Sequence, residues 1–467
     1  MVYSNGIMKD ITIAYIGGGS RGWAWTFMSD LAAEPALSGT VRLFDIDRKA
    51  AEANALIGNA LSAQNDALGK WHYETAGSLG QCLKNADFVI ISILPGTFDE
   101  MYSDVHAPEA FGIYQSVGDT AGPGGMIRAL RAIPMFEEIA NAVKGHAPDA
   151  WVINYTNPMS LCVKALYETF PDIKAFGCCH EVFGTQAMLA AILKRSLGIK
   201  DIPRSEIIVN VLGINHFTWF DRASYEGMDL FPVFADYSQS HFTEGFLDPD
   251  NPWADTFFDC AHRIKFDLFR KYGLIAAAGD RHLAEFLPSD QYLKSPQTVA
   301  QWKFKLTPVN WRKQDLLDKL KKSERLASKT ESIQAAASGE EGVKQIKALC
   351  GLERFVTNVN IPNTARQISN LPDDAIVETN ALFERDAIRP VAAGAVPQQI
   401  LGLITPHLEN HRRITAAAKN FDKNAVLEAF LHDPLIQGRL SEKDTADLVQ
   451  KMLEGTKAYL SAEWFEE

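Results

Sequence analysis

Two short segments of the sequence carry residue types that bind metal ions. Cys179, His180 and Glu181 stand together directly after a predicted strand, and Asn215 and His216 lie in a second, otherwise apolar segment. A thiolate and an imidazole are soft to borderline ligands, so Cys179 paired with His216 would form a sparse metal site with positions left for substrate oxygens. Taken alone, each residue also fits a structural role, as a buried thiol or a hydrogen-bonded core histidine.

Three further polar clusters adjoin predicted strands or helices. Asp119 precedes a Gly-Pro-Gly-Gly turn and a helix whose N-terminus can hold an anion or a hydroxyl-rich ligand. Asn157 follows a strand and precedes a proline, which is also the composition of an ordinary turn. Asp280 and Arg281 offer a base and a guanidinium fork suited to a carboxylate, although they equally fit an exposed polar turn.

A glycine-rich segment with the spacing GxGxxG lies between an apolar run at residues 11–16 and a helical pattern at 23–33. The apolar run predicts a parallel strand buried on both faces. Glycines let the backbone approach a pyrophosphate, and the helix N-terminus stabilises its charge. Asp45 ends the next predicted strand, where it can bind both ribose hydroxyls and would repel a 2′-phosphate. We therefore expect NAD rather than NADP; the alternative is a bare turn in an α/β sheet.

The residues expected to contact the dinucleotide come from this loop and from later turns at the same edge of the sheet. Pro95 belongs to a Pro-Gly turn that follows another buried strand, and such turns commonly face the ligand crevice. The full set is Gly17, Gly19, Ser20, Arg21, Gly22, Asp45, Pro95 and Asn157.

The periodicity of the chain changes near residue 200. Up to that point strands alternate with helices, which predicts a Rossmann-type, doubly wound parallel sheet as an NAD-binding domain of residues 1–200. Residues 201–467 are expected to form an α+β domain for substrate and oligomerisation. In it, 207–221 reads as a long strand continuing into an antiparallel pair, and 316–337 as a charged helix.

Composition excludes several classes of function. The 467 residues are 46% hydrophobic and 22% charged, as in soluble globular proteins, and the net charge of −12 without a basic block argues against a nucleic-acid partner. No apolar run approaches the roughly 20 residues that span a bilayer, and the first residues lack the pattern of a signal peptide. The six cysteines have no disulfide-framework spacing, so we expect a reduced, cytoplasmic location without membrane contact.

Together these motifs resemble glycoside hydrolase family four, the NAD- and divalent-metal-dependent glycosidases. The resemblance covers nearly the whole chain, and the cofactor half is also similar to lactate and malate dehydrogenases. It rests on the Gly-Gly-Gly-Ser loop, the Gly-Asp-Thr and Gly-Pro-Gly-Gly turn, Asn157-Pro158, the Cys-His-Glu-Val tetrad of residues 179–182, the Gly-Ile-Asn-His216 segment and residues 360–363 and 371–372. Family members with Cys-His-Ser-Val are α-glucosidases and α-galactosidases, whereas Cys-His-Glu-Val is similar to the α-galacturonidase subgroup.

The resemblance implies a reaction by oxidation and elimination. NAD⁺ oxidises the sugar at C3, a base removes the acidified C2 proton, the C1 group leaves, water adds, and NADH returns hydride to C3. A metal bound by Cys179 and His216 would hold the C2 and C3 oxygens. Mn²⁺ is the expected ion, although a thiolate and an imidazole alone would suggest Zn²⁺.

Catalytic roles also follow from the resemblance. Asp280 is expected to be the C2 base, with Tyr272 as the alternative because some relatives use a tyrosine. Asp119 is expected near the metal or its waters. His180 takes a position that carries an aspartate acid in phosphosugar relatives, which leaves the leaving-group acid open.

Substrate contacts are expected from four residues. Asn157 and Asn215 would bind sugar hydroxyls. Glu181 and Arg281 would recognise the carboxylate of the uronate, although a glutamate contacts a carboxylate only through water or when protonated.

The expected function is the intracellular removal of α-linked galacturonic acid from short pectin fragments. Within the enzyme class, the alternatives are an α-glucuronidase or a neutral-sugar α-galactosidase. Other classes left open are an NAD-dependent 2-hydroxyacid dehydrogenase and a non-catalytic NAD sensor. Family members are commonly dimers or tetramers, so a homodimer or homotetramer is expected.

Overall fold

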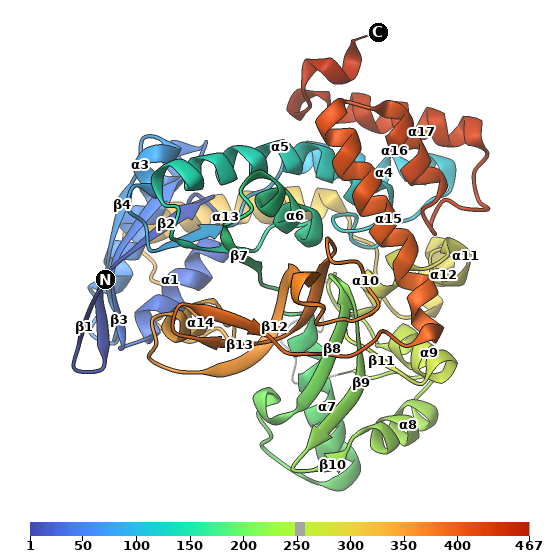
Figure 1. Cartoon of the computed structure of the whole chain (residues 1–467), viewed down its shortest axis with the longest axis horizontal. Coiled ribbons are helices and arrows are strands. Elements are labelled where there is room, and N and C mark those ends of the chain that lie inside the picture. The colour runs from blue at the N-terminus through green and yellow to red at the C-terminus, as the bar shows by residue number, and fades with distance from the viewer. Residues whose placement is uncertain (248–256, 467) are drawn as a thin grey trace.

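The computed structural model describes residues 1–247 and 257–466. Their largest sheet has ten strands in the order β14-β13-β12-β7-β6-β5-β2-β3-β4, with β1 paired to β2 (Figure 1). These strands are β1 (Val2–Ser4), β2 (Ile7–Ile16), β3 (Leu37–Phe44), β4 (Lys70–Thr75), β5 (Phe88–Ile91), β6 (Trp151–Asn154), β7 (Lys174–Gly177), β12 (Phe355–Pro362), β13 (Ile376–Glu384) and β14 (Ala387–Pro390). Neighbouring strands from β4 to β7 are parallel, which confirms the predicted doubly wound sheet.

Alternate residues of β2 enter two separate hydrophobic cores. Ile13 and Tyr15 pack into a core shared with α1, α2 and α14, whereas Ala14 and Ile16 pack into another shared with α3, α5 and α6. The strand is apolar along both faces because helices cover both faces. The helices of these layers are α1 (Trp23–Ala33), α2 (Arg48–Ser62), α3 (Leu79–Leu83), α5 (Gly122–His146), α6 (Met159–Thr169) and α14 (Gly342–Leu349).

The second half of the chain contributes three strands to the same sheet. β12 pairs antiparallel with β7 through Asn360 and Gly177, and β13 and β14 continue the sheet outward. The predicted division at residue 200 thus falls between two segments that share one sheet and one core. The division into two domains stays a prediction.

A second, antiparallel sheet contains β8 (Ile208–Ile214), β9 (Phe217–Tyr225), β10 (Met228–Asp229) and β11 (Ile275–Ala276). The prediction of one strand over 207–221 was wrong, because the chain reverses between Ile214 and Phe217, which face each other across a hairpin. Both arms are apolar, so periodicity alone gives no sign of a turn between them. Asn215 and His216 therefore form the tip of the hairpin rather than the middle of a strand.

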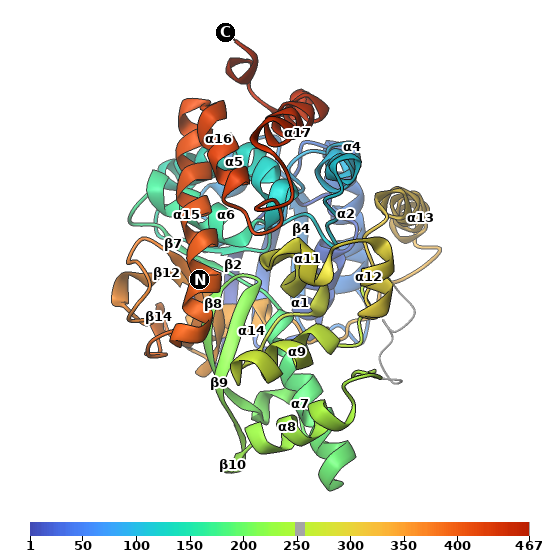
Figure 2. The same ribbon diagram turned by 90° about the vertical axis from the view of Figure 1, so that its right-hand side faces the viewer.

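The remaining helices surround these sheets. They are α4 (Phe98–His106), α7 (Glu181–Leu197), α8 (Phe231–Ser240), α9 (Arg263–Tyr272), α10 (Asp280–Leu283), α11 (Ser289–Tyr292), α12 (Pro296–Gln301), α13 (Val309–Ala327), α15 (Gln398–Asn420), α16 (Lys423–Leu431) and α17 (Glu442–Gly455). α13 runs alongside α2 and α4 (Figure 2). The helix expected at 316–337 therefore begins and ends earlier than predicted. Pro308 directly precedes its first turn. The chain after the helix packs on α1, where the Ser29 hydroxyl donates to the Gln334 and Ala336 carbonyls.

No helix among the described residues combines the length and the apolar character needed to cross a bilayer. The six cysteines are all free thiols.

A buried ion pair joins α4 to α5 beneath the sheet edge that carries the predicted cofactor turns. Arg131 Nη2 lies 2.6 Å from Asp104 Oδ2, and both side chains are almost fully buried. The Nε of Arg131 also donates to the Pro95 carbonyl at 3.1 Å. One guanidinium therefore holds both α4 and the Pro-Gly turn.

We expect Arg131→Met to lower the free energy of unfolding by about 3–5 kcal/mol, because it leaves the Asp104 carboxylate buried without its partner. The matched control is Arg412→Met, which removes an exposed pair with Asp374 and should cost less than about 1 kcal/mol. Urea unfolding of both variants measures the difference. Equal losses would contradict the structural role of the buried pair.

Candidate active site

The loop between β2 and α1 has the shape of a phosphate-binding turn. Gly17 has a φ of +89°, and a Cβ there would lie 2.0 Å from the Ser92 carbonyl oxygen. A Cβ on Gly19 would lie 2.7 Å from that of Ala50, so side chains are excluded at both positions. No side chain caps the N-terminus of α1, whose first N–H groups are left for a ligand. The loop thus fits a pyrophosphate.

Asp45 lies directly beyond β3 and contacts the same glycine loop. Its Oδ2 accepts the Gly19 N–H at 2.8 Å, and its Oδ1 accepts the Asp47 N–H at 2.9 Å. Each carboxylate oxygen can accept a second hydrogen bond, so this half-buried group retains capacity for ribose hydroxyls. The predicted cofactor loop and Asp45 are therefore adjacent, as the fold of the dinucleotide-binding class requires.

Asn157, which follows β6, contacts a second group of polar residues. Its Nδ2 lies 3.4 Å from Asp119 Oδ2, and its carbonyl accepts Arg128 Nε at 3.0 Å. The Oδ1 of Asn157 is buried and has no hydrogen-bond partner among the described residues. An unsatisfied buried acceptor beside a crevice is a position where a ligand hydroxyl can bind.

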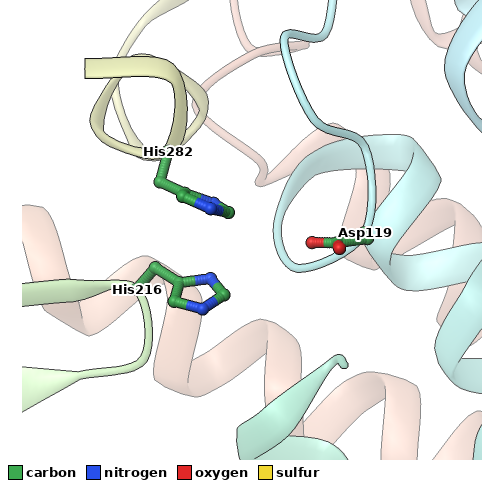
Figure 3. A group of neighbouring side chains, drawn as sticks. All are labelled: Asp119, His216 and His282. Carbon is green, nitrogen blue, oxygen red and sulfur yellow. The ribbon is translucent and has the colours of Figure 1, made fainter. Parts of the chain in front are cut away.

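Asp119, His216 and His282 converge from three separate elements (Figure 3). Asp119 lies in the turn before α5, His216 at the β8–β9 hairpin tip and His282 in α10. Their ligand atoms all lie within 4.8 Å of one another. The two imidazole rings are 4.0 Å apart between centroids, and His216 Nδ1 lies 3.0 Å from the Thr120 hydroxyl. A carboxylate and two imidazoles at this spacing can hold a divalent cation.

The protonation states of this group favour a cation. Burial lowers the pKa of His216 to about 3, with a further lowering from His282. Burial also lowers the pKa of His282. Burial alone would raise the pKa of Asp119, but the Arg128 guanidinium and the two imidazoles hold it at about 2. At neutral pH the group therefore has two neutral imidazoles and one carboxylate, the forms that ligate metals.

Cys179 lies beside this group but not within it. It belongs to neither cluster of three potential ligands found among the described residues. Burial, followed by the Glu378 and Glu181 carboxylates, raises the pKa of its thiol well above the usual value, while the amide of Asn215 opposes the rise. Asn215 Nδ2 in turn donates to Glu378 at 3.1 Å. The Asn215 contact therefore brings Cys179 next to the residue that precedes His216, and its role as a ligand stays a prediction.

The next two residues of the tetrad face different partners. His180 Nδ1 lies 3.2 Å from Glu340 Oε1. Desolvation would lower the pKa of this imidazole, but the Glu340 carboxylate outweighs it and raises the pKa to about 9. Glu181 Oε2 accepts the Gly279 N–H at 2.7 Å, and its other oxygen lies 3.8 Å from His282 Nε2. The predicted acid His180 is thus a protonated, exposed imidazole, and Glu181 borders the cation group.

Asp280 belongs to a different cluster of potential ligands from the group around Asp119. It is fully buried, and its oxygens accept the Ile264 and Lys265 N–H groups, both at 3.1 Å, at the start of α9. Burial raises its pKa to about 6. Asp280 forms a second cluster with Cys260 and His262. Its expected role as C2 base stays a prediction, as does the alternative Tyr272, whose ring packs edge-on against Trp219.

Arg281 ties two loops together. Its Nε donates to the Lys305 carbonyl at 3.1 Å, and its Nη2 donates to the Ser116 carbonyl at 2.6 Å and to the Thr307 hydroxyl. These donors are therefore engaged within the protein rather than directed at a substrate carboxylate. The expected reading of a uronate by Arg281 stays a prediction.

Three residues near the site were not assigned roles from the sequence. His282 stands in the Asp280 segment but was noted there only as part of a polar turn, and Arg128 lies inside α5. Glu285, one turn after His282, accepts the Val117 N–H at 2.6 Å and the Gly118 N–H at 2.9 Å. The polar residues within 280–285 were the sequence signal for His282 and Glu285. Their contacts could not be predicted because they join residues far apart in the sequence.

The fold and the site together define an α/β protein of the dinucleotide-binding class with a group of residues that could hold a cation. The chain belongs to glycosyl hydrolase family 4. The Family 4 glycosyl hydrolase model matches residues 12–195, and the model of that family's C-terminal domain matches residues 211–436. The resemblance drawn from the sequence motifs is confirmed.

Similar proteins cover nearly the full length. An alpha-galacturonidase of Lachnoclostridium phytofermentans is 61% identical over 464 residues, with 99% of this chain and 100% of that protein covered. An alpha-galacturonidase of Bacillus subtilis is 51% identical over 447 residues, with 96% and 98% covered.

Solved structures share the fold. The crystal structure of the Bacillus subtilis protein lplD has a TM-score of 0.90 and 51% identity, and covers 96% of this chain and 100% of that one. A 6-phospho-beta glucosidase from Thermotoga maritima, solved with manganese, NAD⁺ and glucose-6-phosphate, has a TM-score of 0.74 at 20% identity, with 97% and 100% covered.

We expect Asp45→Asn to weaken NAD⁺ binding by about 10- to 100-fold, because hydrogen bonds to a charged acceptor are lost while the Gly19 contact is retained. The affinity for NADP⁺ should not fall, since the repelling charge is gone. Glu52→Gln, an exposed change on the adjoining helix α2, is the control. Fluorescence titration of both dinucleotides measures these effects, and unchanged NAD⁺ affinity in Asp45→Asn would refute the assignment.

Proposed function

We propose that this chain is an α-galacturonidase that uses NAD⁺ and a divalent cation, with Mn²⁺ as the expected ion. The observation that carries the proposal is the group formed by Asp119, His216 and His282 at the edge of a dinucleotide-binding crevice. The names of relatives at 51–61% identity supply the substrate class. Solved structures of the same fold with NAD⁺ and manganese support the pair of cofactors.

When bound, the dinucleotide accepts and returns a hydride and the cation draws electron density from sugar oxygens. Asp119, His216 and His282 would hold the cation, with Cys179 as a further ligand once its thiol loses its proton. One carboxylate and two imidazoles suit Mn²⁺ better than the thiolate–imidazole pair expected from the sequence, which favours Zn²⁺.

The remaining residues would orient the sugar and move protons. The unpartnered Oδ1 of Asn157 would accept a hydrogen bond from a hydroxyl group of the sugar. Asp280, with a pKa of about 6, is ionised at neutral pH and basic enough to take the C2 proton. The protonated imidazole of His180 would donate a proton to the leaving oxygen at C1. The three roles follow the family resemblance.

The reaction itself is tested by hydrolysis of 4-nitrophenyl α-D-galacturonide in deuterated water with NAD⁺ and Mn²⁺. We expect solvent deuterium at C2 of the released sugar and no net NADH, because elimination exchanges that proton and the hydride returns.

Cys179→Ser should lose the response to Mn²⁺ and keep NAD⁺ binding, whereas Cys350→Ser should behave as wild type.

Each opposing result points to a different function. A protiated C2 would indicate ordinary displacement, and net NADH from a hydroxyacid would indicate a dehydrogenase. Cleavage of neutral galactosides alone, or of glucuronides alone, would remove the galacturonide assignment. Cofactor binding without any turnover would favour an NAD sensor.

A further inference from the structure

The first turn of α13 is fixed beside the cation group. Thr307, two residues before the helix, donates its N–H and its hydroxyl to the Ser116 carbonyl at 3.1 and 2.7 Å. The same carbonyl accepts Nη2 of Arg281. Because Ser116 lies three residues before Asp119, these bonds bring the start of α13 to the rim of the candidate site. Arg312 is the fourth residue of this helix.

The guanidinium of Arg312 lies near two aromatic rings and makes no hydrogen bond within the described part of the chain. Its Cζ is 4.6 Å from the ring centroid of Phe258 and 5.5 Å from that of Trp311. Its Nε is buried without a partner, and no hydrogen bond or ion pair to the group is found in residues 1–247 and 257–466. The side chain is only partly exposed, so water compensates its charge incompletely.

The other two arginines near Asp119 each have a carboxyl group as their strongest electrostatic neighbour. Asp119 and then Asp104 are the acidic groups that stabilise the charge of Arg128, and Glu285 is the first that stabilises Arg281. Arg281 also donates three hydrogen bonds to other protein atoms.

Arg312 differs from both. Burial lowers its pKa, as it does for Arg128 and Arg281. Its strongest electrostatic neighbour, however, is the like charge of Arg281, ahead of the opposing charges of Asp119 and Asp315. A guanidinium that makes no hydrogen bond to the described residues, and whose strongest charged neighbour is another cation, is a site for an anion.

We propose that Arg312 binds the carboxylate of the uronic-acid ring and thereby determines the preference for uronides over neutral sugars. This inference rests on the proposed function and assigns its substrate recognition to Arg312 in place of Arg281. A guanidinium fork donates two parallel hydrogen bonds to the two oxygens of a charged carboxylate. An ester and a hydroxymethyl group are uncharged and cannot form this pair. Stacking on Phe258 holds the plane of the fork in place.

The test compares Arg312→Met and Arg312→Lys with wild type on 4-nitrophenyl α-D-galacturonide and on its methyl ester. For Arg312→Met we expect kcat/KM on the free acid to fall about 100-fold, mostly through KM, with about twofold change or less on the ester. Arg312→Lys keeps the charge without the fork and should lie between the two. Lys321→Met removes an exposed charge from the same helix and should change neither substrate.

The ratio of acid to ester turnover separates recognition from a loss of folding, because misfolding lowers both rates together. Should Arg312→Met fail to fold, as judged by NAD⁺ binding and thermal unfolding, the ratio for Arg312→Lys decides. A wild-type enzyme that cleaves no uronide overturns both the proposed function and this inference. A wild type that prefers the acid, with variants that keep the same preference, overturns the role of Arg312 alone.

Discussion

The electrostatic balance around Asp119 is the constraint on which the rest of the site depends. A carboxylate withdrawn from water must be paired or it takes up a proton. Here Arg128 holds Asp119 in its charged form, while burial keeps His216 and His282 neutral. In these states the three side chains are one carboxylate and two neutral imidazoles, which are the forms that bind a divalent cation.

The surrounding structure keeps the three ligands together by fixing the loop that carries Asp119. Glu285 accepts hydrogen bonds from the N–H groups of residues 117 and 118, and the Ser116 carbonyl accepts hydrogen bonds from Arg281 and Thr307. These bonds connect α10, which carries His282, to the turn before α5, which carries Asp119. The cation group therefore lies where the Rossmann-type sheet meets the second half of the chain.

Sequence reasoning was most successful where the signal is local. The buried strand of β2, the glycine turn, helix α1 and Asp45 are contiguous or nearly so. Helix α1 was predicted with correct bounds, whereas β2 begins at Ile7, four residues before the predicted run at 11–16. The hairpin at Asn215 was missed because apolar runs on both sides hide the turn. His282 was passed over because its partners Asp119 and His216 are distant in sequence, and the contacts of Arg281 with Ser116 were not foreseen because they join residues 165 positions apart.

The most direct test of the account is Mn²⁺ binding, measured by isothermal titration calorimetry in the presence of NAD⁺ for wild type and for His282→Gln, with the exposed His72→Gln as control. The account predicts about one ion per chain, an affinity reduced at least about tenfold by His282→Gln, and no change in the control. Wild-type affinity in His282→Gln, or no Mn²⁺ bound by wild type, would contradict it.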